Sequence, residues 1–364
     1  MCPSLDGGWG RILVNLANAF QERDLDVHFL VDDDSGSFNK FLNPSIEIHP
    51  LKTTHTISGI PYFSRHMLQF RPDVILTTVV RHTALACRVK RLTGLPSKIF
   101  PTIHNTYSEK FRKLSARKFR SRIKKVRKYY PQCDKIVAVS EGVKEDFCAL
   151  SRISPEIVKT IYNPVVDESV AERASIPIDD PWFQTGEPPV ILSAGRLEKA
   201  KNFPLLIRSF ELLRKRTRCR LIILGDGGEF DNLNSMARES GYSNDIALPG
   251  HVENPFAYMK QASLFALSSL WEGLPTVLIE AMAIGCPVVS TDCPSGPREI
   301  LLNGKYGRVV PINDQEKLAK AMLETLENPL PSEILKKRAS EFTVSKSVKN
   351  YFRLFGLIHE ESEI

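Results

Sequence analysis

Two carboxylates stand inside an apolar stretch of the chain. Residues 268–291, SSLWEGLPTVLIEAMAIGCPVVST, carry Glu272 and Glu280 on either side of a Gly-Leu-Pro turn. The run SLFALSS predicts a buried strand, and PTVLIEAMAIG predicts a helix with Pro275 in its first turn and Gly285 at its end. A carboxylate in such surroundings is costly unless it is paired or hydrogen-bonded. We therefore expect both acids to have polar partners.

The turn and the helix start have the pattern of an anion site. Gly273, Leu274 and Thr276 would point amide groups at whatever lies above the strand end, and a phosphate would fit there. Glu280 follows Thr276 by about one turn, where its carboxylate could hold two adjacent ribose hydroxyls. Glu272 could hold a sugar hydroxyl. A pair with a nearby arginine is the alternative for either acid.

Two cations follow a predicted strand in the same half of the chain. In SAGRLEKAKNFPLLIRSF, Arg196 and Lys201 stand between that strand and an amphipathic helix. An arginine that grips oxygens as a fork and a lysine that acts as a point charge suit a diphosphate. Basic residues at helix starts are common, but together with Glu272 and Glu280 they indicate a specific site.

Strand and helix patterns alternate along the 364 residues, which predicts parallel sheets covered by helices. We expect an α/β fold of two Rossmann-like doubly wound domains that face each other across a cleft. The first domain would span 1–165, a linker 166–187 and the second domain 188–345, and a C-terminal helix in 346–364 would cross back to the first domain. Ligands of such sheets bind beyond the carboxyl ends of the strands.

Composition narrows the class of protein. The chain is 42% hydrophobic and 25% charged, its seven cysteines are scattered without a CxxC pair, and its start lacks a signal-peptide pattern. No apolar run reaches the roughly 20 residues that a membrane span needs. We expect a cytoplasmic protein without a cysteine metal site.

Much of the net charge of +7 lies in residues 109–130, EKFRKLSARKFRSRIKKVRKYY. Their spacing predicts one helix with basic faces and a narrow apolar stripe. The stripe consists of Phe111, Leu114, Phe119, Ile123, Val126 and Tyr130. A solvated surface helix, a helix lying on an anionic membrane and a helix that attracts a phosphate-bearing substrate are the alternatives. No motif indicates a nucleic-acid partner.

The first half of the chain adds weaker candidates. In LDGGWGRI, Gly7 and Gly8 would let backbone approach a phosphate closely, with a simple turn as the alternative. His104 follows a strand and could contact a sugar or an acceptor, although a lone histidine is as often structural. The DDD run in 31–37 favours a solvated loop over a metal site, and GDGGEFD predicts a strand-to-helix turn that lines the expected ligand site of the second domain.

The second half resembles a known family. GRLEKAKNFPLLIRSF, LGDGGEFDNL, LPGHVENPFAYMKQASLFALSSLWEGLPTVLIEAMAIGCPVVSTDCPSGPREIL and NGKYGRVVP are together similar to the nucleotide-binding domain of the retaining glycosyltransferases of family 4, the group 1 transferases of GT-B fold. The similarity is nearly continuous over 189–345 and looser before it. It implies a UDP- or GDP-type sugar donor in the second domain, an acceptor held mainly by the first, and no metal ion.

The resemblance also implies roles for single residues. Arg196 and Lys201 would grip the diphosphate, Glu280 the ribose and Glu272 the transferred sugar. The backbone around His251 to Asn254 would hold the base. Catalysis would then be mostly electrostatic, through charge stabilised on the diphosphate.

These observations predict a metal-independent retaining transferase. It would move a hexose or N-acetylhexosamine to a lipid-linked or growing saccharide acceptor in cell-envelope polysaccharide or glycoconjugate synthesis, in the cytoplasm or peripherally at the inner face of the membrane. An epimerase of nucleotide sugars and a non-catalytic GT-B scaffold are the alternatives.

The start of the chain departs from the family pattern. Family members begin with a buried strand that runs into the PSLDGG loop, whereas this sequence starts Met1-Cys2-Pro3. That strand is central in a doubly wound sheet. We therefore expect a truncated chain whose first sheet lacks its central strand, or else a sheet closed by other segments.

Overall fold

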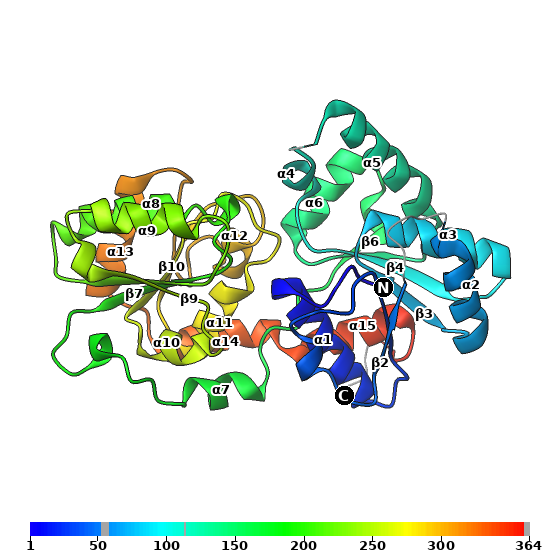
Figure 1. The fold of residues 1–364 in the computed structure, drawn as a ribbon, viewed down its shortest axis with the longest axis horizontal. Helices are drawn as coiled ribbons and strands as arrows, with labels where there is room; N and C mark the ends of the chain where they lie inside the picture. The colour runs from blue at the N-terminus through cyan, green and yellow to red at the C-terminus, as the bar shows by residue number, and fades with distance from the viewer. Residues whose placement is uncertain (52–57, 113, 360–364) are drawn as a thin grey trace. The chain divides into compact units, whose positions relative to one another are not determined.

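The computed structural model describes residues 1–51, 58–112 and 114–359, and it divides into two compact units (Figure 1). The first unit comprises Met1–Pro164 and the segment from Val344 on, and the second comprises Val165–Thr343. The segment 166–187, expected to be a linker, therefore falls in the second unit. It holds helix α7 (Glu168–Ala174), which packs on α10 (Pro255–Gln261).

The second unit is built on one parallel sheet of six strands in the order β12-β11-β10-β7-β8-β9. The strands are β7 (Val190–Ala194), β8 (Arg220–Leu224), β9 (Ile246–Gly250), β10 (Leu264–Leu267), β11 (Val288–Thr291) and β12 (Arg308–Val310). Every residue of β7, β10 and β11 is buried, as expected for strands covered on both faces. The first strand of this unit, β7, lies between β8 and β10, which is the switch point of a doubly wound sheet.

Helices cover both faces of this sheet (Figure 1). One layer holds α8 (Phe203–Arg214), α9 (Phe230–Glu239) and α13 (Gln315–Glu327), with α8 packed on α13. The other holds α10, α11 (Thr276–Ile284) and α14 (Ser332–Ala339), with α11 packed on α14. A short helix, α12 (Pro297–Ile300), follows β11.

The first unit contains two parallel sheets, β1-β2 and β3-β4-β5-β6. The strands are β1 (His28–Val31), β2 (Glu47–Pro50), β3 (Val74–Thr77), β4 (Lys98–Ile103), β5 (Ile136–Ala138) and β6 (Val158–Thr160). The helices are α1 (Gly7–Gln21), α2 (Gly59–Phe70), α3 (Val80–Thr93), α4 (Tyr107–Arg112), α5 (Ala116–Tyr129), α6 (Glu141–Ser151) and α15 (Val344–Phe355). Strand β10 of the second unit lies within SLFALSS, the run that the sequence predicts to be a buried strand.

The first two residues of the chain lie between these two sheets. The Cys2 amide donates to Leu30 O at 3.0 Å, on the side of β1. The terminal amine of Met1 donates to Leu76 O at 2.7 Å, and the Thr78 amide donates to Met1 O at 3.3 Å, on the side of β3. This short segment thus takes the place in the sheet where the central strand was expected.

The basic segment 109–130 is not one helix, contrary to the prediction. Helix α4 ends at Arg112 and α5 begins at Ala116. Between them Ser115 is extended, and its side chain accepts a hydrogen bond from the Lys118 amide at 3.5 Å. A serine at an N-cap accepts a hydrogen bond from a first-turn amide and so favours the start of a new helix. Ser115 is therefore the signal that the helical spacing concealed.

The apolar stripe of this segment packs inside the first unit. Phe111, Ile123, Val126 and Tyr130 are buried, and the other two members, Leu114 and Phe119, are half-buried. The stripe therefore cannot also enter a bilayer, whereas the basic side chains of α5 are exposed. Within the described ranges, no helix combines the length and the apolar character that crossing a bilayer requires.

The C-terminal helix α15 belongs to the first unit, where it packs on α1. Phe20 of α1 packs against three aromatic side chains of α15, with 5.7 to 5.9 Å between ring centroids: Tyr351, Phe352 and Phe355. The Lys98 ammonium donates to Phe355 O at 3.1 Å, which ties the helix end to β4.

Candidate active site

Loops pack together at the carboxyl ends of the central strands of the second unit. The loops after β7 and β8 touch at their glycines: a Cβ at Gly225 would lie 2.0 Å from Gly195 O, and one at Gly227 would lie 2.6 Å from Leu197 O. The Leu197 amide donates to Asp226 O at 2.8 Å. The GDGG sequence is therefore a tight strand-to-helix turn, as predicted, held against the loop after β7.

An ion pair joins the loop after β7 to the loop after β10. Lys201, at the end of the short helix η5 (Lys199–Lys201), places its Nζ 2.7 Å from Glu272 Oε1. The Ser269 hydroxyl donates to the same oxygen at 2.6 Å. The two charged side chains are only 19% and 13% exposed, so water screens them less than it screens a surface pair. Lys201, which is predicted to bind the diphosphate, thus contacts Glu272, which is predicted to bind the sugar.

Backbone contacts fix the same two loops. The Leu270 amide donates to Ala200 O at 2.7 Å, and the Ser268 hydroxyl donates to Lys201 O at 2.8 Å. The Lys201 side chain crosses Gly195, where a Cβ would lie 3.3 Å from Lys201 Cε. The ion pair is therefore carried by fixed backbone at the switch point of the sheet, where ligands of doubly wound domains bind.

Arg196 lies in the same loop but does not join this pair. Its Nη1 is 3.0 Å from Glu198 Oε1, and the two side chains are 55% and 50% exposed. An exposed pair contributes about 0 to 1 kcal/mol. The guanidinium can therefore turn to another anion at little cost.

Helix α11 starts and ends as the sequence predicts. Pro275 precedes its first residue, Thr276, and Gly285 ends it with a φ of +86°. The Leu278 amide donates to Pro275 O at 3.1 Å, and the amides before it, those of Thr276 and Val277, point out of the helix N-terminus. Leu274, just before the helix, is buried, and Thr276 is half-buried. The turn and the helix start that the predicted anion site requires are present, and anion binding there stays a prediction.

The loop after β11 supports the turn before α11. The Ser295 hydroxyl donates to Gly273 O at 2.7 Å. A Cβ at Gly296, where φ is +93°, would lie 2.4 Å from the Pro275 ring. Sequence reasoning gave this loop no role of its own, although its CPSGP run has the composition of a turn.

Glu280 lies within α11, 4% exposed. Among the residues that the structure describes, it is the only buried Asp or Glu. Its neighbours Leu278, Ile279 and Ala281 are fully buried. A carboxylate at such a position costs stability unless polar groups meet it. The apolar sequence around Glu280 predicts this burial.

The predicted base-binding backbone follows β9. His251 is exposed, whereas the Asn254 amide group donates to Arg173 O at 2.8 Å. Arg173 in turn donates to Glu253 O at 2.9 Å and lies 4.5 Å from the Phe256 ring centre. Helix α7 thus orders this loop. Sequence reasoning missed Arg173 because its surroundings showed no helical period and were assigned to the linker.

The predicted glycines of the first unit differ in what they do. Gly7 begins α1 with a φ of +63°, whereas a Cβ at Gly8 would meet nothing within 4 Å. The close approach belongs instead to Gly10, where a Cβ would lie 2.4 Å from the Leu5 carbonyl carbon. A side chain at Gly8 would therefore meet no neighbour.

His104 lies near the same helix start. Its Nε2 is 2.9 Å from Thr102 Oγ1, and its ring lies edge-on to Trp9 at 6.4 Å between centroids. Burial lowers the pKa of His104 to about 4, so the imidazole is neutral at pH 7. Its Nδ1 is buried and has no hydrogen-bond partner among the described residues.

The DDD run after β1 is only partly a solvated loop. Asp32 forms an ion pair with Arg81 and lies 3.0 Å from His82 Nε2. Asp33 accepts from the Ser35 amide at 3.0 Å. The first aspartate of the run is thus engaged by α3, and only the later ones are exposed.

Two family models match this chain, one in each half. The model of Glycosyltransferase Family 4 matches residues 6–169, and that of Glycosyl transferases group 1 matches residues 178–342. Together they span nearly all of the chain.

Curated relatives act in glycan synthesis. The N-acetylgalactosamine-N,N'-diacetylbacillosaminyl-diphospho-undecaprenol 4-alpha-N-acetylgalactosaminyltransferase of Campylobacter jejuni is 34% identical over 201 residues, 55% of this chain and 52% of that protein. The lipopolysaccharide 1,6-galactosyltransferase of Salmonella typhimurium is 28% identical over 252 residues, 68% of this chain and 64% of the relative. The chain thus spans about half the length of the first relative and somewhat more of the second.

Solved structures share the fold. The apo form of the lipopolysaccharide outer core galactosyltransferase WaaB has a TM-score of 0.75 at 22% identity, covering 98% of this chain and 100% of that one. Anabaena Alr3699/HepE in complex with UDP has a TM-score of 0.79 at 18% identity, with the same coverage. These likenesses confirm the predicted α/β fold of GT-B type, with parallel sheets in two domains.

Proposed function

Because the chain belongs to the family 4, group 1 glycosyltransferases, we propose that it moves a hexose or N-acetylhexosamine from a UDP- or GDP-type sugar donor to a saccharide or lipid-linked acceptor. The names of the relatives support an acceptor in cell-envelope glycan synthesis, since they include an undecaprenyl-diphosphate-linked saccharide and lipopolysaccharide. The complex of a structural neighbour with UDP supports a nucleotide donor.

The contact between Lys201 and Glu272 carries this proposal. The Lys201 ammonium and the Glu272 carboxylate lie 2.7 Å apart at the switch point of the sheet, beside the turn into α11. A donor diphosphate would compete with Glu272 for the ammonium, and the released carboxylate would accept hydrogen bonds from hydroxyls of the transferred sugar. We assign Arg196 and the first-turn amides of α11 to the same diphosphate, because negative charge is favourable there.

The remaining donor contacts follow from position and burial. We assign the buried carboxylate of Glu280 to the ribose hydroxyls and the backbone around His251 to Asn254 to the base. In the first unit we assign Gly7, Gly8 and the neutral imidazole of His104 to the donor phosphate and the acceptor side.

In the proposed reaction the configuration of the sugar is retained. The acceptor oxygen bonds to the anomeric carbon on the face from which the diphosphate leaves, and a diphosphate oxygen takes the acceptor proton. No side chain acts as a nucleophile and no metal ion takes part. Lys201, Arg196 and the helix amides stabilise the charge that grows on the leaving group, so they serve the transition state more than binding.

The test is a transfer assay with purified protein. Donors are first selected by thermal shift, since a ligand that binds only the native state raises its stability. We expect nucleoside diphosphate release only with donor and acceptor together, and a product whose anomeric proton coupling matches the donor. Conversion of the donor sugar without acceptor would indicate an epimerase, and binding without turnover would indicate a scaffold.

We also propose that the basic face of α5 draws the protein to an anionic membrane surface. Its exposed cations are Arg117, Lys118, Arg120, Arg122, Lys124, Lys125, Arg127 and Lys128. Because the apolar stripe packs inside the first unit, this contact would be electrostatic, at about 1 kcal/mol per charge near the surface.

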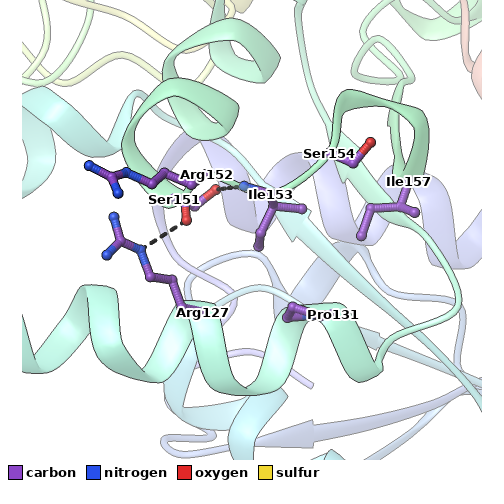
Figure 2. A pocket seen from close by; sticks show the side chains of 7 residues that line it. All are labelled: Arg127, Pro131, Ser151, Arg152, Ile153, Ser154 and Ile157. Carbon is purple, nitrogen blue, oxygen red and sulfur yellow. Dashed lines mark hydrogen bonds between the residues drawn. The ribbon is translucent and has the colours of Figure 1, made fainter.

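Arg127 also has a structural role, because it contacts the end of α6. Figure 2 shows it with Arg152 at a pocket between α5 and the end of α6. Arg127 donates to Ser151 O at 3.0 Å and to Leu150 O at 3.3 Å, which caps the last carbonyls of α6. Variants that test the surface should therefore keep Arg127.

A further inference from the structure

A histidine cluster lies on one face of the β1-β2 sheet. His28, the first residue of β1, pairs in register with Glu47, the first residue of β2. His49 follows Glu47 by two residues, so the three side chains point to the same face. His28 and Glu47 begin their strands, whereas His104 follows the carboxyl end of β4.

The ligand atoms of this cluster have the spacing of a metal site. His28 Nδ1 lies 3.3 Å from His49 Nε2, and Glu47 Oε2 lies 3.2 Å from His49 Nε2. All three atoms lie within 4.8 Å of one another. Two ligands at about 2.05 Å from a tetrahedral zinc ion are about 3.3 Å apart. One ion can therefore bind all three with small side-chain movements.

The surroundings favour ligation by neutral imidazole. His28 Nε2, the nitrogen turned away from His49, lies 3.2 Å from Asp26 Oδ1. Ligating histidines commonly give their second ring N–H to such a carboxylate, which fixes the tautomer and raises the basicity of the ligand.

Helix α2 covers the cluster with an aromatic stripe. Tyr62, His66 and Phe70, spaced by one turn, lie on one face of the helix. The Phe70 ring is 4.4 Å from the His28 ring, and the His66 ring is 4.6 Å from the His49 ring, between centroids. His66 Nε2 is buried with no hydrogen-bond partner among the described residues, which makes it a candidate for the fourth position.

We propose that His28, Glu47 and His49 bind one divalent transition-metal ion, with zinc favoured by the two imidazoles and one carboxylate. The ion would fasten β2 to β1 and take no part in sugar transfer. A hydrogen bond between the two imidazoles is the competing explanation of the same distances. It predicts no metal binding.

The test is titration of the full chain, without a histidine tag, with Zn²⁺ by calorimetry and with Co²⁺ by visible absorption. We expect one ion per chain, a tetrahedral Co²⁺ spectrum and a higher melting temperature with Zn²⁺. His49→Ala and the near-isosteric Glu47→Gln should each lose this binding. Asp26→Asn, which alters only the orienting carboxylate, should weaken it about 10- to 100-fold.

His359→Ala is the matched control, because it removes a histidine outside the cluster and should bind as the parent does. Circular dichroism checks that each variant is folded. Absence of saturable 1:1 binding by the folded parent would overturn the proposal, and so would unchanged binding by the folded His49→Ala variant. Donor binding by the His49→Ala variant should equal that of the parent, so this test is independent of the proposed transferase activity.

Discussion

The candidate residues of the two units differ in charge. In the second unit they form a half-buried ion pair, Lys201 with Glu272, beside a helix N-terminus and a buried carboxylate. In the first unit they are an open glycine and a neutral histidine beside a tryptophan. Charged groups suit a diphosphate, and neutral groups with apolar neighbours suit sugar surfaces. This contrast supports the proposal that the second unit binds the charged diphosphate, whereas the first unit contacts neutral sugar surfaces.

The largest expected effect tests the charged side of this contrast. Lys201→Met should lower kcat by about 10²- to 10³-fold, as the removal of one preorganised donor does. It also leaves Glu272 half-buried without its cation, which costs stability. Transfer kinetics and urea unfolding measure the two effects separately.

A double variant separates the two roles of Lys201. In Lys201→Met/Glu272→Gln the unpaired charge is gone, so the free energy of unfolding should recover while kcat stays low. Recovery of both would show that the pair is structural only. Glu198→Gln, in the exposed pair with Arg196, is the control and should change stability by less than about 1 kcal/mol.

The second prediction concerns the buried carboxylate. Glu280→Gln should weaken nucleoside diphosphate binding by about 1.5 to 3 kcal/mol, the value of a hydrogen bond to a charged group. Calorimetric titration measures this change. Glu316→Gln, an exposed position on α13, should bind as the parent does. Equal affinities in the two variants would contradict the ribose assignment.

The same contrast explains what the sequence could predict. The local structure of the second unit could be predicted because its motifs are continuous in sequence. The run GLPTVLIEAMAIG alone predicts a turn, a helix start and a helix end. The sequence did not predict which charged residues form ion pairs with each other. Lys201 and Glu272 are 71 residues apart, and only the order β10-β7 places their loops side by side.

In the first unit, local signals were outweighed by tertiary contacts. The helical period of 109–130 hid the N-cap at Ser115. The burial of Phe111, Ile123 and Val126 shows that the apolar stripe packs within the first unit, whereas the alternatives for the basic face stay open. Gly10 and Gly8 cannot be distinguished by sequence, because the close neighbour of Gly10 is the backbone of Leu5. The cluster of His28, Glu47 and His49 depends on strand register, which residue types alone do not reveal.

The third prediction tests the basic face of α5, where charge in the first unit is gathered. Lys124→Gln/Lys125→Gln should weaken binding to vesicles that contain anionic lipid by up to about 2 kcal/mol, from about 1 kcal/mol per charge. Sedimentation with vesicles at low salt measures it. Lys215→Gln/Arg216→Gln removes two adjacent exposed charges from the second unit and should bind nearly as the parent does. Equal losses in both variants would indicate a general charge effect.

The smallest expected effect tests the neutral side of the contrast. The pKa of His104 is lowered from 6.5 to about 4 by burial, so between these pH values the unfolded chain holds a proton that the folded protein does not. Stability contributed by the neutral ring is present above about pH 6.5 and is lost as the pH falls toward 4. His104→Gln lacks this titration. The parent should therefore lose about 1 kcal/mol more than the variant between pH 6.5 and 4, once partial exposure of the ring is allowed for. Urea unfolding at both pH values measures the difference, and parallel pH profiles would mean that His104 is protonated as easily in the folded protein as in the unfolded chain.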